Sequence, residues 1–367
     1  MQLNRAFLLA ACALPAANTA LAESAPERAT IAYKYLDYLD SQPGRDRIRV
    51  GSSAVQLAVP VAGEWLLATT ATTDAISGAS PAYHSSALKK MTDQRNAIGV
   101  DVTRYFALTT LSVGANVSGE SDYVSRGVSF KVSRSDESKN TTWNAAAALL
   151  RDAINPSNRV VQDETKNVTD ALVGLTQVWS PVDIVQVNLG YSTGSGYFTD
   201  PYKAVDQRPR ERSHWTLSGR WNHHFYDAGD TARLSYRYFS DTWGIRSHTL
   251  GLEWVRPLSD GWTMTPQARY YTQTAADFYV PADASVTPFA PNPPDGAVYF
   301  TEDHRLSNFG AFTLGLKVSK RLDADWSADV KVKWYQQRGE WSALGSGSEG
   351  LEPFSARSIQ IGISRQF

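Results

Sequence analysis

The segment Ala356–Phe367 reads A-R-S-I-Q-I-G-I-S-R-Q-F, and Ile359, Ile361 and Ile363 alternate in it with small or polar residues. Side chains of a β-strand alternate between its two faces, so the segment predicts a strand with one apolar face. Phe367 lies in phase with the isoleucines. Such a strand suits a soluble β-protein or a barrel in a membrane, and other parts of the chain distinguish the two.

An apolar face that ends in a terminal aromatic residue resembles the C-terminal signal strand of Gram-negative outer-membrane β-barrels. In such a barrel the last strand pairs with the first, so no strand edge is left unpaired in lipid. We therefore take Ile359, Ile361, Ile363 and Phe367 as the candidate assembly signal, which the barrel-assembly machinery would recognise. Arg365 departs from the pattern, because an apolar or aromatic residue usually stands there.

Residues 1–22 have the features of an export signal. Arg5 gives a positive start, Ala6–Leu14 an apolar core, and Ala20–Ala22 a small-residue cleavage site. A lipoprotein signal at Cys12 is the alternative, but the apolar run before that cysteine is short. Cys12 is the only cysteine, so the predicted mature chain, residues 23–367, has no disulfide and no Cys-ligated metal. We expect these residues to form one outer-membrane barrel domain.

The composition narrows the class of protein further. The formal net charge is −1, which argues against a nucleic-acid partner. No stretch after the signal approaches the roughly 20 apolar residues that a membrane helix needs. Barrel strands instead alternate lipid-facing apolar residues with lumen-facing polar ones. The chain therefore predicts strands, not helices, in contact with outer-membrane lipid.

Strand-like segments recur at regular spacing, with turn residues between them. About sixteen are present, an even number, as single-chain bacterial barrels require. The sequence thus predicts an all-β fold, a transmembrane antiparallel up-and-down β-barrel. The expected strands are Thr30–Asp40, Asp46–Pro60, Glu64–Ser77, Arg95–Phe106, Leu108–Gly119, Tyr123–Ser133, Thr141–Leu150, Val168–Trp179, Asp183–Ser195, Ser213–Tyr226, Thr231–Ser240, Arg246–Pro257, Trp262–Ala275, Asn308–Lys320, Trp326–Arg338 and Ala356–Phe367.

The connections between these segments alternate in length beyond the second strand. Short ones such as Val61–Gly63 and Ser180–Val182 alternate with long ones such as Gly78–Gln94 and Arg151–Asn167. Outer-membrane barrels have short periplasmic turns and long extracellular loops, whereas soluble sandwiches and propellers have no reason to sort loops in this way. Aromatic residues near the short turns predict an interfacial girdle. They are Trp65, Tyr105, Phe106, Trp179, Trp254, Trp262 and Trp326.

The predicted register places charged side chains on the inner wall of the last strands. Positive charges outnumber negative ones there, so an aqueous lumen would favour anionic solutes. The alternative is a ladder of ion pairs that stiffens the barrel and binds nothing. The lumen and selectivity candidates are Arg220, Arg233, Arg237, Glu253, Arg269, Lys317, Asp329, Lys331 and Lys333.

The segment Tyr197–Arg212 is a candidate constriction loop, because it is charged and also carries aromatic residues that water would solvate poorly. It could fold into the mouth of the barrel or lie as a solvated surface loop. The constriction candidates are Asp200, Tyr202, Lys203, Arg208, Arg210 and Arg212.

Metal and catalytic motifs receive no support from the sequence. His223 and His224 are adjacent, so on a strand they face opposite ways and cannot chelate one ion. A Ser/His/Asn hydrolase inside a barrel wall is conceivable, but no spacing selects such a set and G-x-S-x-G is absent. We therefore expect no enzyme activity, no metal and no cofactor.

Eight strings spread over the chain resemble a proteobacterial outer-membrane β-barrel family labelled domain of unknown function 3570. The resemblance implies a porin-like protein of the cell outer membrane without an agreed substrate or established catalytic residues. It also implies a periplasmic flavin transferase and a thioredoxin-like protein as neighbours. The strings are Y-K-Y-L-D-Y-L-D-S-Q-P-G-R-D-R-I-R-V from Tyr33, S-G-A-S-P-A-Y-H from Ser77, T-R-Y-F from Thr103, G-Y-F-T-D-P-Y-K from Gly196, R-P-R-E-R from Arg208, R-W-N-H-H-F from Arg220, G-I-R-S-H-T-L-G-L-E-W from Gly244 and R-Y-Y-T-Q-T-A-A-D-F-Y from Arg269.

Two functions follow from these patterns. The first is a porin-like barrel that passes small polar solutes, anionic ones in particular. The second is a non-conducting barrel that serves as a scaffold for a periplasmic or surface redox or metal-linked partner. A barrel-embedded hydrolase is the least favoured alternative.

Overall fold

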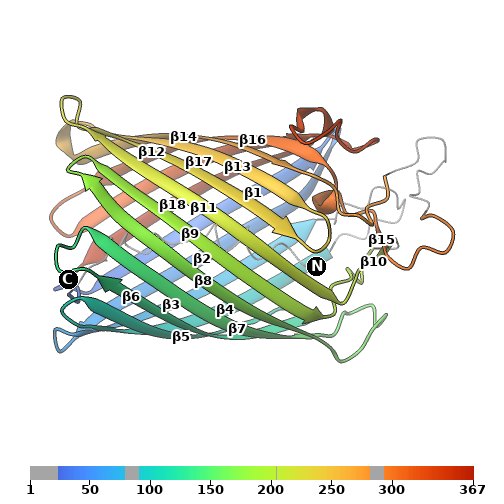
Figure 1. Cartoon of the computed structure of the whole chain (residues 1–367), viewed down its shortest axis with the longest axis horizontal. Coiled ribbons are helices and arrows are strands. Elements are labelled where there is room, and N and C mark those ends of the chain that lie inside the picture. Colours follow the sequence, from blue (N-terminus) through green and yellow to red (C-terminus); the bar gives the residue numbers. More distant parts are fainter. Residues whose placement is uncertain (1–23, 79–90, 204, 282–292) are drawn as a thin grey trace.

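Sixteen of the strands in the described residues close into one antiparallel barrel (Figure 1). The computed structural model describes residues 24–78, 91–203, 205–281 and 293–367. The predicted transmembrane barrel is thereby confirmed. The barrel strands are β1 (Thr30–Gln42), β2 (Arg45–Val61), β3 (Trp65–Gly78), β4 (Met91–Tyr105), β5 (Thr109–Gly119), β6 (Tyr123–Ser135), β7 (Thr141–Ile154), β8 (Glu164–Ser180), β9 (Asp183–Gly196), β11 (Glu211–Phe225), β12 (Asp230–Asp241), β13 (Arg246–Pro257), β14 (Trp262–Gln273), β16 (Phe309–Arg321), β17 (Trp326–Arg338) and β18 (Phe354–Gln366).

The barrel closes where β1 pairs with β18, from Thr30 opposite Gln366 to Ser41 opposite Ser355. Backbone bonds continue this pairing beyond the strands, because the N–H groups of Ala29 and Phe367 each donate to the other residue's carbonyl at 2.9 Å. The closing strand is the segment with the alternating isoleucines. Every strand edge of the barrel is therefore paired, as a lipid environment requires.

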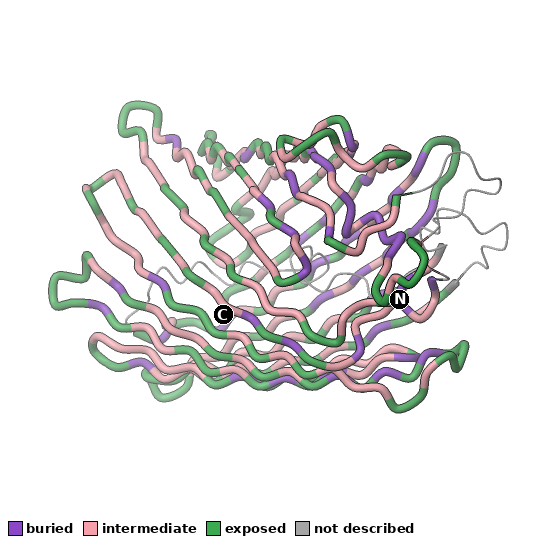
Figure 2. Tube along the Cα trace, turned by 45° about the vertical axis from the view of Figure 1, so that its right-hand side comes forward, coloured by how far each residue is buried: buried purple, intermediate pink, exposed green. Residues whose placement is uncertain are grey.

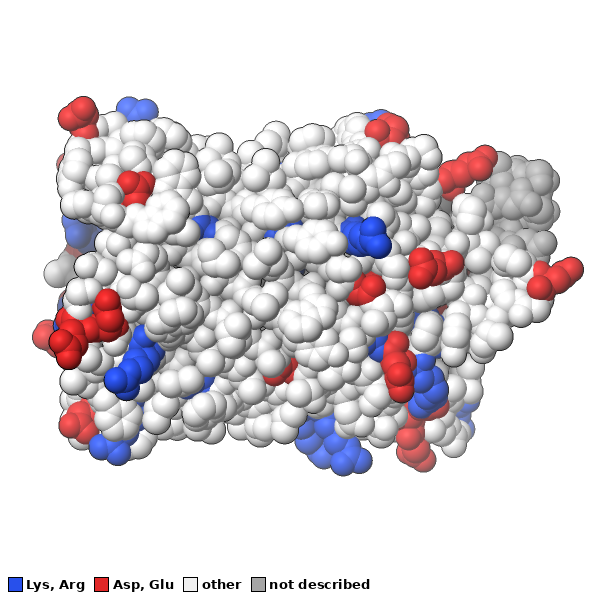
Figure 3. Space-filling model, in the orientation of Figure 1, with Lys and Arg blue, Asp and Glu red and all other residues white. Residues whose placement is uncertain are grey.

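The outer surface of the barrel is apolar between two charged ends. Ile359, Ile361 and Ile363 are 43%, 50% and 40% exposed and face outward. Exposed and less exposed positions alternate along the strands (Figure 2), as a wall with one face to lipid and one to a lumen demands. On the face drawn in Figure 3, most charged side chains lie toward the two ends. Among the described residues, no helix is long and apolar enough to span a membrane.

Aromatic residues form the expected girdle near the short turns, with one correction. Trp65, Phe106 and Trp179 are exposed on the outer surface, whereas Tyr105 is only 8% exposed. Tyr105 was wrongly assigned to the girdle, because it precedes Phe106 and strand alternation turns it to the inside. The girdle also accounts for Arg365, whose guanidinium lies 5.3 Å from the ring centre of Trp326. An arginine near the short turns can extend its guanidinium to the membrane–water interface and also contact the face of an aromatic ring.

The two rims differ in loop length, though less regularly than predicted. The rim that holds both ends of the described chain has only short turns. The opposite rim carries the long loops but also three short connections, at 43–44, 120–122 and 242–245. The long rim is the extracellular one by the usual arrangement.

At the extracellular rim two long loops fold against each other. Strand β10 (Asp206–Gln207) pairs with β15 (Phe300–Thr301), and the helical turn η2 (His304–Leu306) follows β15. We call the described residues 197–203, 205–210, 274–281 and 293–308 the mouth cap. Its small apolar cluster joins Ala276 and Leu306 to residues of the β12–β13 connection. The cap lies at the right-hand end of the barrel in Figure 1.

Candidate permeation path

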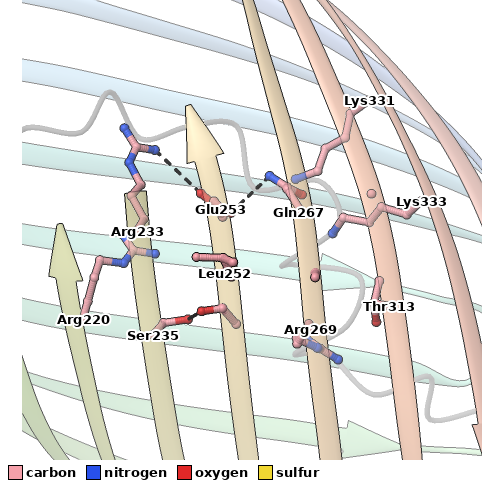
Figure 4. A pocket seen from close by; sticks show the side chains of 13 residues that line it. Arg220, Arg233, Ser235, Leu252, Glu253, Gln267, Arg269, Thr313, Lys331 and Lys333 are labelled. Carbon is pink, nitrogen blue, oxygen red and sulfur yellow. Dashed lines mark hydrogen bonds and ion pairs between the residues drawn. The ribbon is translucent and has the colours of Figure 1, made fainter. Parts of the chain in front are cut away.

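A pocket of about 190 Å³ opens on the inner wall formed by β11 to β17 (Figure 4). Its floor includes Gly251 and Gly315. A Cβ atom on Gly251 would lie 2.7 Å from Ser235 Oγ, so the missing side chain leaves room at this point. The charged lining residues are Arg220, Arg233, Glu253, Arg269, Lys331 and Lys333.

Strand register explains why these charges meet. Arg233 lies directly opposite Glu253 on the neighbouring strand, and Arg220 lies opposite Ser235, which also lines the pocket. Residues directly opposite each other on neighbouring strands point to the same face of the sheet. The alternation of side chains along each strand is therefore enough to bring these charges together. The sequence register therefore placed these six side chains on the correct wall.

Positive charge is in excess within the pocket. Arg233 Nη1 lies 3.7 Å from Glu253 Oε2, and Gln267 Nε2 donates to Glu253 Oε1 at 3.1 Å. Within the described residues, no ion pair joins Arg220, Arg269 or Lys333 to a carboxylate. Five lining cations thus share one lining carboxylate. A group of like charges in a lumen attracts anions of the solution.

The remaining three lumen candidates lie beside the pocket and do not line it. Lys317 is directly opposite Lys331 on the neighbouring strand. Arg237 is within electrostatic range of Arg269. Asp329 lies over Gly362, since a Cβ atom there would be 2.7 Å from Asp329 Oδ1. The basic wall, as we name these nine side chains together, extends above and below the pocket.

The opposite wall, from β3 to β8, carries charges that the sequence analysis missed. Arg95 Nε donates to Asp74 Oδ2 at 2.7 Å, and Lys166 Nζ lies 3.3 Å from Asp152 Oδ2. Lys131 Nζ lies 4.0 Å from an oxygen of Asp101. These residues follow the same alternation as the basic wall, so extending the register to the early strands would have found them.

On this opposite wall, Arg95, Lys131 and Lys166 each lie within 4.0 Å of a carboxylate. On the basic wall, Arg220, Arg269 and Lys333 have no such partner among the described residues. The lumen is therefore asymmetric in charge across its width.

A buried ion cluster holds the mouth cap together. Asp303 has no exposed surface, and its carboxylate accepts from Arg208 Nη2 at 2.8 Å and from Arg305 Nε at 2.9 Å. Lys203 Nζ lies 3.9 Å from the same carboxylate. Arg208 Nε also donates to Asp206 at 2.9 Å. The cluster joins the two loops through charges that are buried except for that of Arg305, whose side chain is 32% exposed.

The environment of the cluster shifts the pKa values of its members in different directions. Burial alone would raise the pKa of Asp303, but the charges of Arg305, Lys203 and Arg208 outweigh it and hold that pKa well below its usual value. Burial raises the pKa of Asp206 despite the opposing charge of Arg208. Burial also lowers the pKa of His304 well below its usual value, so the imidazole is neutral near pH 7.

The mouth cap contacts connections on opposite sides of the barrel mouth. Tyr202 Oη donates to Asp122 Oδ2 at 2.6 Å in the β5–β6 turn, and Asn158 Nδ2 donates to the carbonyl of Pro201 at 2.7 Å. Far from these, the His304 ring stacks on Phe354 of β18 with centroids 5.5 Å apart. The cap is therefore attached to the rim at the connections after β5 and β7 and also at β18.

Apart from Tyr202, which bonds to Asp122, the constriction candidates separate into two groups. Asp200, Lys203 and Arg208 belong to the buried cluster or contact it, since Arg305 Nη2 lies 3.5 Å from Asp200. Arg210 and Arg212 instead secure the base of the loop. They do so through two bonds from Arg210 to Glu164, at 3.0 and 2.7 Å, and one from Arg212 Nε to Asp241 at 2.9 Å.

Three carboxylates at the rim, Asp93, Glu120 and Asp122, place ligand atoms within 4.8 Å of one another. Burial, with the nearby charges of Asp122 and Asp93, raises the pKa of Glu120 to about 7. No other feature of the described rim indicates a cation there. His223 and His224 contact different partners, Asp183 at 2.8 Å and Thr231 at 3.1 Å.

The sequence matches the family described as "Protein of unknown function (DUF3570)" over residues 4–90 and 85–357. The chain belongs to this family. The resemblance that the eight strings indicated is thereby confirmed. No curated protein matches the sequence.

Solved structures resemble the chain in fold. A "Bacterial polysaccharide outer membrane secretin" matches with a TM-score of 0.55 and 9% identity, over 92% of this chain and 98% of that chain. OccK9 (OpdG) of Pseudomonas aeruginosa matches with a TM-score of 0.43 and 9% identity, over 93% of this chain and 98% of that chain. The first likeness supports the outer-membrane barrel fold and nothing finer at this identity.

Proposed function

We propose that this DUF3570 barrel is an outer-membrane channel for small polar solutes and that it prefers anions. The observation that carries the proposal is the excess of positive charge in the pocket, where Arg220, Arg269 and Lys333 have no carboxylate partner among the described residues. Lumen charges of one sign raise the local concentration of solutes of the other sign. The pocket is also smaller than the roughly 300–1,000 Å³ of a drug-sized ligand site, which suits a small solute.

Planar-bilayer recording tests the channel directly. The purified barrel should give discrete conductance steps, with a zero-current potential that favours anions across a salt gradient. Arg269→Gln together with Lys333→Gln should reduce that preference. Lys131→Gln is the matched control, because Lys131 lies near Asp101 on the opposite wall and is not part of the positive excess. An equal change in all variants would contradict a special role for the basic wall.

A non-conducting scaffold is the second candidate, and the mouth cap is the observation that favours it. A cap held by contacts to Asp122 and to Phe354 would narrow the entrance to the lumen. Bilayers that stay silent with the wild-type barrel, but conduct after Asp303→Asn loosens the cap, would favour a closed channel. Silence in both proteins would favour the scaffold.

The export signal of residues 1–22 and the assembly signal stay part of the proposal. Residues 1–22 lie outside the described residues. We expect the protein in the outer-membrane fraction, with heat-modifiable migration on gels. Recovery as a soluble periplasmic protein would contradict the proposal.

A further inference from the structure

Two arginines face each other on the outer surface of the barrel. Arg126 of β6 lies directly opposite Arg151 of β7. Both are exposed, and both share the outward face of their strands with apolar residues, Val128 on β6 and Leu149 on β7. Like charges directly opposite each other destabilise a sheet unless a counter-ion lies between them. This pair is therefore an unusual arrangement for a surface that contacts lipid.

The pair lies close to the extracellular rim. Arg126 comes three residues after Tyr123, where β6 begins, and Arg151 comes three residues before Ile154, where β7 ends. With a rise of about 3.4 Å per residue and a strand tilt of about 40°, the pair lies roughly 8 Å below the strand ends. Long arginine side chains this close to a rim can extend their guanidinium groups to the headgroup region of the outer leaflet.

The barrel supplies no acidic neighbour to the pair. Directly beside the two arginines on the outer face lie Val117 of β5 and Asn167 of β8. Asn167 in turn lies opposite Ser195 of β9. Within the described residues no ion pair joins either arginine to a carboxylate. The row therefore presents two guanidinium groups followed by the neutral side chains of Asn167 and Ser195. The nearest acidic residue of the row is Glu211 of β11, opposite Ser195 and three strands, about 14 Å, from Arg151.

Arg49, elsewhere on the outer face near the same rim, shows the contrasting arrangement. Its Nε and Nη2 donate to the two carboxylate oxygens of Asp37 at 3.1 and 2.6 Å. An outward arginine at this end of the barrel can thus carry its own counter-ion. Arg126 and Arg151 instead leave two guanidinium forks for an anion from outside.

We infer that Arg126 and Arg151 bind the phosphate groups of lipopolysaccharide, the phosphorylated glycolipid of the outer leaflet. Guanidinium groups match phosphate oxygens through paired hydrogen bonds, and two of them compensate the charge of one phosphate group. The polar side chains of Asn167 and Ser195 extend the row where sugar hydroxyls of the same headgroup would lie. The inference depends on the outer-membrane location and is independent of the channel function.

The test uses the purified, detergent-solubilised barrel and lipid A with both phosphates as the probe. Native mass spectrometry should show binding that falls about tenfold in the Arg126→Gln, Arg151→Gln double variant. The control Arg49→Gln should bind as the wild type does, because Asp37 already neutralises Arg49. Heat-modifiable migration checks that each variant is folded, and removing the two like charges should not harm the fold.

Two further probes separate the sources of phosphate. Lipid A without its phosphates should bind the wild type as weakly as the phosphorylated form binds the double variant. Inorganic phosphate that binds as tightly as lipid A would overturn the assignment to a lipid headgroup. Equal losses in the double variant and in Arg49→Gln would overturn the site itself.

Discussion

The mouth cap and the basic wall are both rich in cations, but those of the cap bond to carboxylates whereas several of the basic wall do not. In the cap, Arg208 and Arg305 each bond to the buried carboxylate of Asp303. In the pocket, Arg220 and Arg269 face the lumen without a carboxylate partner among the described residues. Arginine side chains therefore hold two loops together in the mouth cap, whereas in the pocket they have no fixed carboxylate partner.

The difference follows from burial. A charge withdrawn from water needs a partner, because its desolvation costs several kcal/mol. A charge beside an aqueous lumen keeps much of its hydration, so it tolerates the lack of a fixed partner. Under the proposed channel function, pairing with a carboxylate separates structural cations from those that act on solutes in the lumen.

Removing the shared carboxylate of the cap should have the largest effect. Asp303→Asn leaves the buried Arg208 and Lys203 and the half-buried Arg305 without their common partner, and breaking a buried pair costs about 3–5 kcal/mol. We expect the cap to open while the barrel stays folded. Limited proteolysis should then cut within residues 197–210 in the variant and not in the wild type.

The control for this prediction is Glu340→Gln. Glu340 pairs with Arg338 at 3.3 Å on the exposed surface, where an ion pair contributes about 0–1 kcal/mol. Cleavage of the cap in this control would show that protection does not depend on the buried cluster.

Acid should weaken the cap through His304 before it affects Asp303. The folded-state pKa of Asp303 is depressed, so its stabilising contribution is present above the unfolded value of about 3.9 and is lost only as the pH falls through the lower folded value. Asp206, whose pKa is raised by burial, acts in the opposite sense, since acid removes a charge that the fold disfavours. His304, whose folded pKa is held well below its usual value by burial, stabilises the cap above its unfolded pKa of about 6.5, and this contribution declines as the pH falls below that value. Protection of the cap from an acid-tolerant protease should therefore weaken between pH 7 and pH 5.

Protection that stays constant from pH 7 to pH 5 and falls only below pH 4 would contradict this account. It would assign the pH dependence of the cap to its carboxylates instead of to His304.

Neutralising unpaired cations of the basic wall should have a small effect on stability. Arg269→Gln and Lys333→Gln remove charges that repel one another, so we expect the free energy of unfolding to change by no more than about 0.5 kcal/mol. Arg95→Gln, which leaves the buried Asp74 without its bond, should be clearly more destabilising. Urea unfolding in detergent compares the three variants, and equal losses would remove the distinction between the regions.

The barrel could be predicted from the sequence because its signals are local and repeat. Alternation with period two located the strands and turned Arg233 and Lys331 to one wall. The pocket lined by both then follows from register alone. The alternating isoleucines of the last strand also predicted that this strand pairs with the first and closes the barrel.

The mouth cap could not be predicted in the same way. Arg208 and Asp303 are 95 residues apart in sequence and meet through irregular segments without a period. The sequence leaves open whether the loop folds into the mouth or lies on the surface, and no pattern indicates its partner loop or the buried cluster. Arg126 and Arg151 also escaped notice, because their importance lies in a strand pairing that residue types alone do not reveal.

The zero-current potential across a salt gradient tests the central claim most directly. The wild-type barrel should favour anions at about 0.1 M salt, where the Debye length is about 10 Å, and lose that preference near 1 M, where it is about 3 Å. Arg269→Glu together with Lys333→Glu should shift the potential toward cations. An open channel whose potential is the same in wild type and variant at low salt would contradict the claim that the basic wall selects anions.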